Sequence, residues 1–142
     1  MKQPLIFICS PYKGDTQTNL KNARRYCRFA ITHRANCISP GVSGLRTPSG
    51  RVLTPPALAT LGLHQQGGIP FAPHLLFTQF LDDSEKRERD AGIAMGTAML
   101  ALCDEVWMFD ELTTGMRIEL AAAIRMDKPV RRFNKWCMEA PA

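Results

Sequence analysis

The sequence predicts an α/β fold of three layers, a Rossmann- or flavodoxin-like parallel sheet of four to five strands with helices on both faces. Short apolar runs recur along the chain, as strands need when both of their faces are covered. Longer segments with helical spacing of apolar residues separate these runs, which indicates βαβ units. The 142 residues, 45% apolar and 22% charged, suit a single domain with one substantial core.

The first βα unit is predicted at the start of the chain. Residues 5–9 are continuously apolar and form a strand, and residues 10–15 form a loop because they contain a proline and a glycine. A helix opens at Thr18 or Asn19 and runs to about His33, with apolar side chains on one face.

Residues 36–68 differ from the rest in being rich in Gly, Pro, Ser and Thr. This composition predicts a loop-rich insertion, in which residues 57–66 could form one short helix. A loop of this length inside a domain is unusual, so we expect it to pass over the sheet edge or the mouth of a site.

The second βα unit is predicted after the insertion. Residues 69–72 form a short strand that ends at Pro73 and His74. The charged run 82–90 begins a helix with Ser84 as its cap, and this helix continues to Leu100.

The third unit contains the residues of greatest functional interest. Residues 106–109 predict a buried strand that ends at Asp110, and the turn at 113–115 leads into a helix with Glu119 in its first turn. Open α/β sheets place ligands where strands end at helix N-termini, so both carboxylates are expected to face one crevice. A last edge strand is predicted at 128–133.

Composition narrows the classes of function. The net charge of +5 suits an anionic ligand, or equally a solvated face of a helix. No apolar run reaches the ~20 residues that cross a bilayer, and no secretory signal is visible, so a cytoplasmic protein without a membrane partner is expected. The five cysteines form no CxxC, and the three histidines lack metal-ligand spacing, so reduced thiols and no metal or other cofactor are expected. P-loop and GxGxxG patterns are absent.

Four short motifs together resemble the nucleoside 2-deoxyribosyltransferase superfamily, in particular its small bacterial and phage-type members. They are Ser10–Gly14, Pro73–His74, Cys103–Trp107 and Thr113–Glu119. The likeness covers residues 4–34 and 67–133 and leaves the insertion out.

The resemblance implies roles for individual residues. Glu119 corresponds to the nucleophile, Asp110 to an acid that handles the base or the sugar hydroxyls, and Tyr12 to a group that touches nucleophile and sugar. Asp90 is the nearest candidate for a third carboxylate of the family. In nucleotide-cleaving relatives the first loop and the turn before the glutamate hold the 5′-phosphate, and His74 follows a strand end within reach. The implied substrate- and phosphate-binding residues are therefore Ser10, Lys13, Gly14, His74, Thr113, Gly115 and Met116.

The chemistry that these residues would support is cleavage of an N-glycosidic bond. A carboxylate traps the oxocarbenium-like centre covalently while an acid assists the departing base, as in retaining glycoside hydrolysis. A helix N-terminus would favour ionised Glu119, and desolvation would raise the pKa of Asp110. Each residue also has a structural interpretation: Glu119 could satisfy a helix dipole, Tyr12 could cover the core, and His74 could bond to backbone.

Three hypotheses follow. The first is an enzyme that cleaves or transfers the glycosidic bond of a nucleoside or nucleoside 5′-monophosphate, and the resemblance implies a homodimer or higher homo-oligomer. The second is a non-catalytic nucleotide-binding or sensing module of the same fold. The third is nucleic-acid binding through the arginines of the first helix, which is not expected because stacking aromatics are not interleaved with them.

Overall fold

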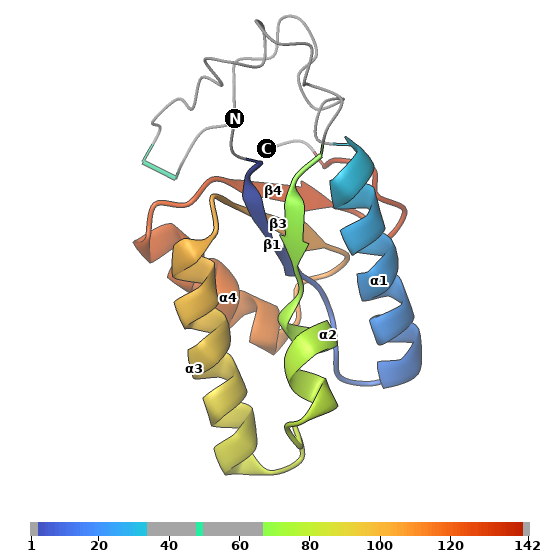
Figure 1. Ribbon diagram of the computed structural model, residues 1–142, viewed down its shortest axis with the longest axis vertical. Coiled ribbons are helices and arrows are strands. Elements are labelled where there is room, and N and C mark those ends of the chain that lie inside the picture. Colours follow the sequence, from blue (N-terminus) through green and yellow to red (C-terminus); the bar gives the residue numbers. More distant parts are fainter. Residues whose placement is uncertain (1–2, 34–47, 50–66, 141–142) are drawn as a thin grey trace, which may run out of the picture.

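Four parallel strands form one sheet in the part of the chain that the computed structural model describes, residues 3–33, 48–49 and 67–140 (Figure 1). The strands are β1 (Leu5–Cys9), β2 (Ile69–Phe71), β3 (Glu105–Phe109) and β4 (Val130–Phe133), in the spatial order β2-β1-β3-β4. This order is that of a flavodoxin-like doubly wound sheet. The predicted α/β fold is confirmed.

Helices cover both faces of the sheet, as predicted (Figure 1). The helix α1 (Thr16–His33) and the short α2 (Pro73–Leu76) pack on one face, and the 3-10 turn η3 (Phe77–Gln79) follows α2. The helices α3 (Lys86–Leu102) and α4 (Thr114–Arg125) pack on the other face. The strand β1 therefore lies at the centre, between two hydrophobic cores.

The core on the α1 face is aromatic. Tyr26 stacks on Phe109 with ring centroids 4.2 Å apart, and Phe133 stacks on the same ring at 4.9 Å. The core on the other face is built mainly from aliphatic and sulfur-containing side chains, and Phe7 is the aromatic residue among its buried members. Every residue of β3 is buried, which explains why its run of apolar residues predicted it so directly.

Two helix starts differ from the prediction. The helix α1 begins at Thr16, two or three residues earlier than predicted, because the Asp15 carboxylate caps it by accepting hydrogen bonds from the Thr18 amide (3.1 Å) and hydroxyl (2.7 Å). Ser84 does not cap α3, because its amide and hydroxyl both donate to Asp82 Oδ1. The α3 N-cap residue is Glu85, without a side-chain cap bond.

The segment around the second strand also differs. The strand β2 ends at Phe71, one residue before the predicted end, and the apolar segment after it forms α2 and η3. Nearly all of the predicted 36–68 insertion lies outside the described residues, including the expected short helix at 57–66. Where the chain re-enters the fold, the Gly67 amide donates to Ile31 O at 2.8 Å, an approach too close for any Cβ at this position.

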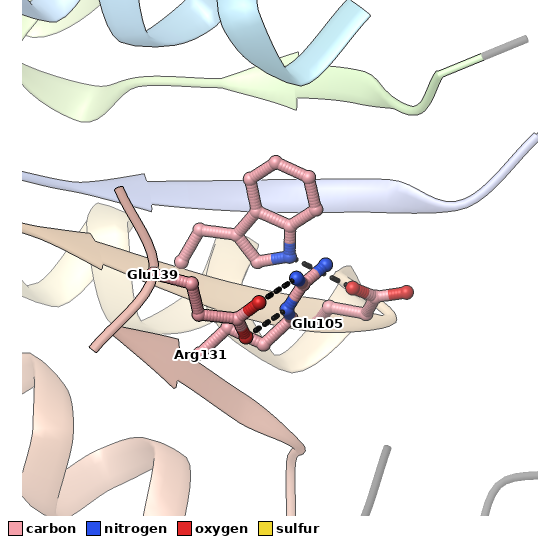
Figure 2. A network of polar contacts seen from close by, with 4 residues as sticks. Glu105, Arg131 and Glu139 are labelled. Carbon is pink, nitrogen blue, oxygen red and sulfur yellow. Dashed lines mark hydrogen bonds and ion pairs between the residues drawn. The ribbon is translucent and has the colours of Figure 1, made fainter. Parts of the chain in front are cut away.

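The C-terminal segment folds back on the sheet through a polar network (Figure 2). The buried Arg131 guanidinium donates from Nε to Glu139 Oε1 at 2.8 Å, in a bidentate pair, and lies 4.9 Å from the centre of the Trp107 ring. The Trp107 indole N–H donates in turn to the buried Glu105 carboxylate at 2.8 Å. This network ties residues 134–140 to β3 and β4.

Candidate functional site

The carboxyl ends of β1 and β3 lie side by side, because Cys9 pairs with Met108 near the end of each strand. The chain leaves β1 toward β2 on one side and β3 toward β4 on the other, so the strand order reverses here. Such a switch point is where open α/β sheets bind ligands. The loop after Cys9 and the loop after Phe109 both begin at this edge.

A cleft opens beside this edge, between the α2-η3 segment, α3 and α4. It encloses about 60 Å³, which is room for a few water molecules. A whole nucleoside would therefore extend out of it. The polar side chains that line it are His74, Thr78, Asp83, Glu88, Arg89 and Glu119, and the apolar ones include Phe77, Leu81 and Ile93.

Glu119 reaches the cleft from the second turn of α4. The helix begins after Thr113, whose hydroxyl oxygen accepts a hydrogen bond from the Met116 amide at 3.3 Å, so Glu119 is not in the first turn as predicted. The expected stabilisation of its ionised form by the helix N-terminus is therefore wrong, since that effect fades beyond the first turn. Burial instead raises the pKa of Glu119 to about 7, opposed by a hydrogen bond from Cys9 that lowers it.

The hydrogen bond between Cys9 and Glu119 joins residues that are 110 positions apart in the sequence. The Cys9 thiol donates to Glu119 Oε2 at 2.7 Å. Cys9 itself is fully buried at the end of β1, in the core that α3 and α4 cover. The bond thus anchors the carboxylate of α4 to the central strand.

Tyr12 and His74 form a stacked pair, and His74 lines the same cleft as Glu119. Their ring centroids are 5.0 Å apart and their planes differ by 17°. Burial lowers the pKa of His74, while the charge of Asp83 and a backbone hydrogen bond with Ser10 oppose that change. Burial and then the nearby charges of Asp83 and Asp82 raise the pKa of the Tyr12 hydroxyl. At neutral pH the pair is therefore an uncharged imidazole beside a protonated phenol.

Asp110 lies outside the cleft that contains Glu119. It adopts the left-handed backbone conformation with φ 69°, and its Oδ1 accepts a hydrogen bond from the Glu111 amide at 2.9 Å. Its charge contributes to raising the pKa of Tyr26 to about 12, after burial as the main cause, which places Asp110 near α1. The single crevice expected for both carboxylates is not what the structure forms.

The residues predicted to hold a phosphate differ in burial, so they do not form one exposed site. Ser10 is buried, and its Oγ has no hydrogen-bond partner among the described residues, whereas Lys13 and Gly14 are exposed in the first loop. Gly14 has φ +99°, and open space surrounds it. Gly115 is exposed at the start of α4, while Met116 is fully buried in the core.

Cys9, Asp83, Glu88 and Arg89 are cleft or near-cleft residues that sequence reasoning missed. The last three belong to the charged run that was interpreted only as a helix start, and Cys9 belongs to an apolar strand. Asp90, the candidate third carboxylate, is instead exposed and forms an ion pair with Lys86 at 3.0 Å.

The described residues contain no group of three or more His, Cys, Asp or Glu side chains arranged to hold a metal ion. They also contain no helix with the length and apolar character needed to span a bilayer.

The sequence was compared with protein families and with curated proteins. The family described as "Domain of unknown function (DUF7768)" matches residues 4–43 and 59–133, which include all four strands and every residue named in the cleft. Residues 44–58, left out of the match, fall within the predicted insertion. The curated proteins give no match.

Proposed function

The chain belongs to the DUF7768 family, and we propose that this member cleaves or transfers the N-glycosidic bond of a nucleoside or nucleoside 5′-monophosphate, with Glu119 as nucleophile. The observation that carries the proposal is a largely buried glutamate that lines a cleft and is held by one thiol at the carboxyl end of β1, where the strand order reverses. The sequence resemblance to nucleoside 2-deoxyribosyltransferases supports the same residue.

The reaction would have two steps. In the first, a carboxylate oxygen of Glu119 bonds to the anomeric carbon while the bond from that carbon to the base nitrogen breaks. The base nitrogen leaves with that electron pair and takes a proton from a solvent water. In the second, water or another base attacks the anomeric carbon, loses a proton, and releases the Glu119 carboxylate. Water gives hydrolysis, and a second base gives transfer.

Tyr12, which stacks on the cleft-lining His74, is the group that we assign to the departing base. Its raised pKa keeps the hydroxyl protonated at neutral pH, so it can donate a hydrogen bond as negative charge develops. His74 holds the Tyr12 ring by stacking and is itself held by the Ser10 backbone. Asp110, expected from sequence to be the acid, lies outside the cleft and is given no step.

A second function is favoured by the position of Asp110. With Asp110 outside the cleft and so not placed to act as the acid, the cleft could bind a nucleotide and leave it intact, as a sensing module would. A ligand that raises the melting temperature by mass action and is recovered unchanged distinguishes this function from turnover.

Homo-oligomerisation is part of the proposal. The helices α3 and α4 expose apolar side chains, and a whole nucleoside extends beyond the cleft, so a second copy could cover both. The exposed apolar residues are Ile93, Met95, Leu102, Ile118 and Ile124. Light scattering that gives the mass of one chain at micromolar concentration would refute this part.

The test of the function is release of free base. The purified protein is incubated with a panel of nucleosides and 5′-monophosphates, alone and with a second base, and products are separated by chromatography. We expect base release or exchange that Glu119→Gln abolishes and that the exposed-residue control Glu111→Gln retains. Absence of base release from every substrate, or equal rates in wild type and Glu119→Gln, contradicts the proposal.

A further inference from the structure

Cys9 is placed where it can control one oxygen of Glu119. It is the last residue of β1 and is 0% exposed, and its side chain points into the core under α3 and α4. Its Sγ lies 2.7 Å from Glu119 Oε2. Among the described residues, no other group donates a hydrogen bond to this carboxylate.

We propose that Cys9 is a positioning residue for Glu119: the thiol holds Oε2, so that Oε1 faces the cleft as the attacking oxygen. This inference rests on the proposed function, because it assigns an attacking atom. The physical claim beneath it, that the Cys9 thiol sets the orientation and proton affinity of the Glu119 carboxyl, is independent of turnover.

The thiol keeps its proton under the conditions in which Glu119 ionises. Burial raises the pKa of Cys9 well above its ordinary value, and the charge of Glu119 and the hydrogen bond to it raise it further. Ionised Glu119 therefore makes the thiol a more secure donor. The bond is present in the form of the protein that would attack.

A thiol suits this place better than a hydroxyl would. The S–H group is a weak hydrogen-bond donor, so it orients the carboxylate while withdrawing little of its basicity. A serine hydroxyl would stabilise the ionised form more strongly and make Glu119 a weaker base and nucleophile. Cys9 thus orients the Glu119 carboxylate and at the same time leaves it basic enough to react.

Other ionisable groups line the same cleft as the Glu119 carboxylate, and they are unchanged in the experiment. They are His74 on α2, Asp83 before α3, and Glu88 and Arg89 on α3. Cys103 provides a matched control for packing, since it is equally buried in the same core and makes no hydrogen bond to Glu119. Any general effect of losing a buried thiol appears in both variants.

The experiment follows the Glu119 carboxyl carbon by NMR through a pH titration of the full chain labelled in glutamate, with Glu119→Gln to assign the signal. We expect Cys9→Ala to raise the proton affinity of Glu119 about threefold to tenfold. Cys9→Ser should lower it, and Cys103→Ala should leave it unchanged. Identical titrations in Cys9→Ala, Cys9→Ser and Cys103→Ala overturn the proposal.

A measurement on the wild type covers the case in which a variant does not fold. The S–H stretching band in the Raman spectrum should contain a component that moves to lower frequency as Glu119 ionises, and Glu119→Gln should lack this movement. A band that is independent of pH in wild type refutes the hydrogen bond directly.

These results separate the two proposals. The expected order of titrations without any base release means that the pairing is correct and the glycosidic reaction is wrong. Base release with no difference among the titrations means that the reaction is correct and the role of Cys9 is wrong.

Discussion

Replacing Glu119 by glutamine should make the protein more stable than the wild type above neutral pH. This pH-dependent gain in stability should disappear near pH 4.5. Glutamine keeps the shape of the side chain and can still accept a hydrogen bond from Cys9. It lacks the negative charge that the wild type must bury once Glu119 ionises. The variant therefore isolates one titration.

The magnitude follows from the pKa of Glu119, which burial raises from 4.5 to about 7. Between these values the folded state binds more protons than the unfolded state, so the free energy of unfolding falls as pH rises and levels off above about 7. The difference is about 2.5 pH units, each worth about 1.4 kcal/mol, which sets an upper value of about 3.5 kcal/mol. Partial exposure to the cleft screens the charge, so we expect about 2–3 kcal/mol.

The assay is urea unfolding of wild type and Glu119→Gln, followed by circular dichroism between about pH 4.5 and about pH 8. The quantity of interest is the difference in the free energy of unfolding between the two proteins at each pH, because all other titrations cancel. Glu111→Gln, at an exposed position, should give a curve parallel to that of wild type. If the Glu119→Gln curve is also parallel to that of wild type, Glu119 titrates as an exposed glutamate and the reasoning fails.

Two further predictions concern charge. Glu139→Gln should destabilise the fold by about 1–3 kcal/mol in thermal or urea unfolding, because it weakens a bidentate bond to the buried Arg131. Asp90→Asn, which removes one charge of an exposed ion pair, should cost under about 0.5 kcal/mol. Equal losses of stability in the two variants would contradict this reasoning. Nucleosides should have a higher kcat/KM than their 5′-monophosphates, because the carboxylates of Asp83 and Glu88 line the cleft and repel the phosphate. Asp83→Asn should bring the kcat/KM values of the two substrates closer together. An unchanged ratio of nucleoside to monophosphate kcat/KM speaks against this charge selection.

The fold was predictable because its strands are buried on both faces. The runs at residues 5–9 and 106–109 are apolar throughout for that reason, and the helices between them carry the matching apolar faces. The helix start at Asp15 was also within reach of local reasoning, since its carboxylate caps through a residue three positions ahead. These features depend on neighbours in the chain.

The site was less predictable because its contacts are long-range. Glu119 was identified through a motif, but its raised pKa comes from burial and its hydrogen bond from Cys9, which a strand pattern marks only as core. Asp110 was placed at the correct strand end, yet it has a left-handed backbone conformation and does not line the cleft that contains Glu119. The pairing of Tyr12 with His74 depends on how β1 and β2 lie together.

The central position of β1 has a consequence for the order of folding. Its partners β2 and β3 come from distant parts of the chain, since Leu5 pairs with Ile69 and Ile6 with Glu105, whereas Val106 pairs with Val130 across a single helix. Closing the shorter loop costs less entropy, so the β3-α4-β4 unit should form first and β1 should insert late. Pulse-labelled hydrogen exchange that protects β1 amides before those of β4 would contradict this order. Cys9 arrives with β1, so a folding chain acquires its glutamate first and the thiol that orients it last.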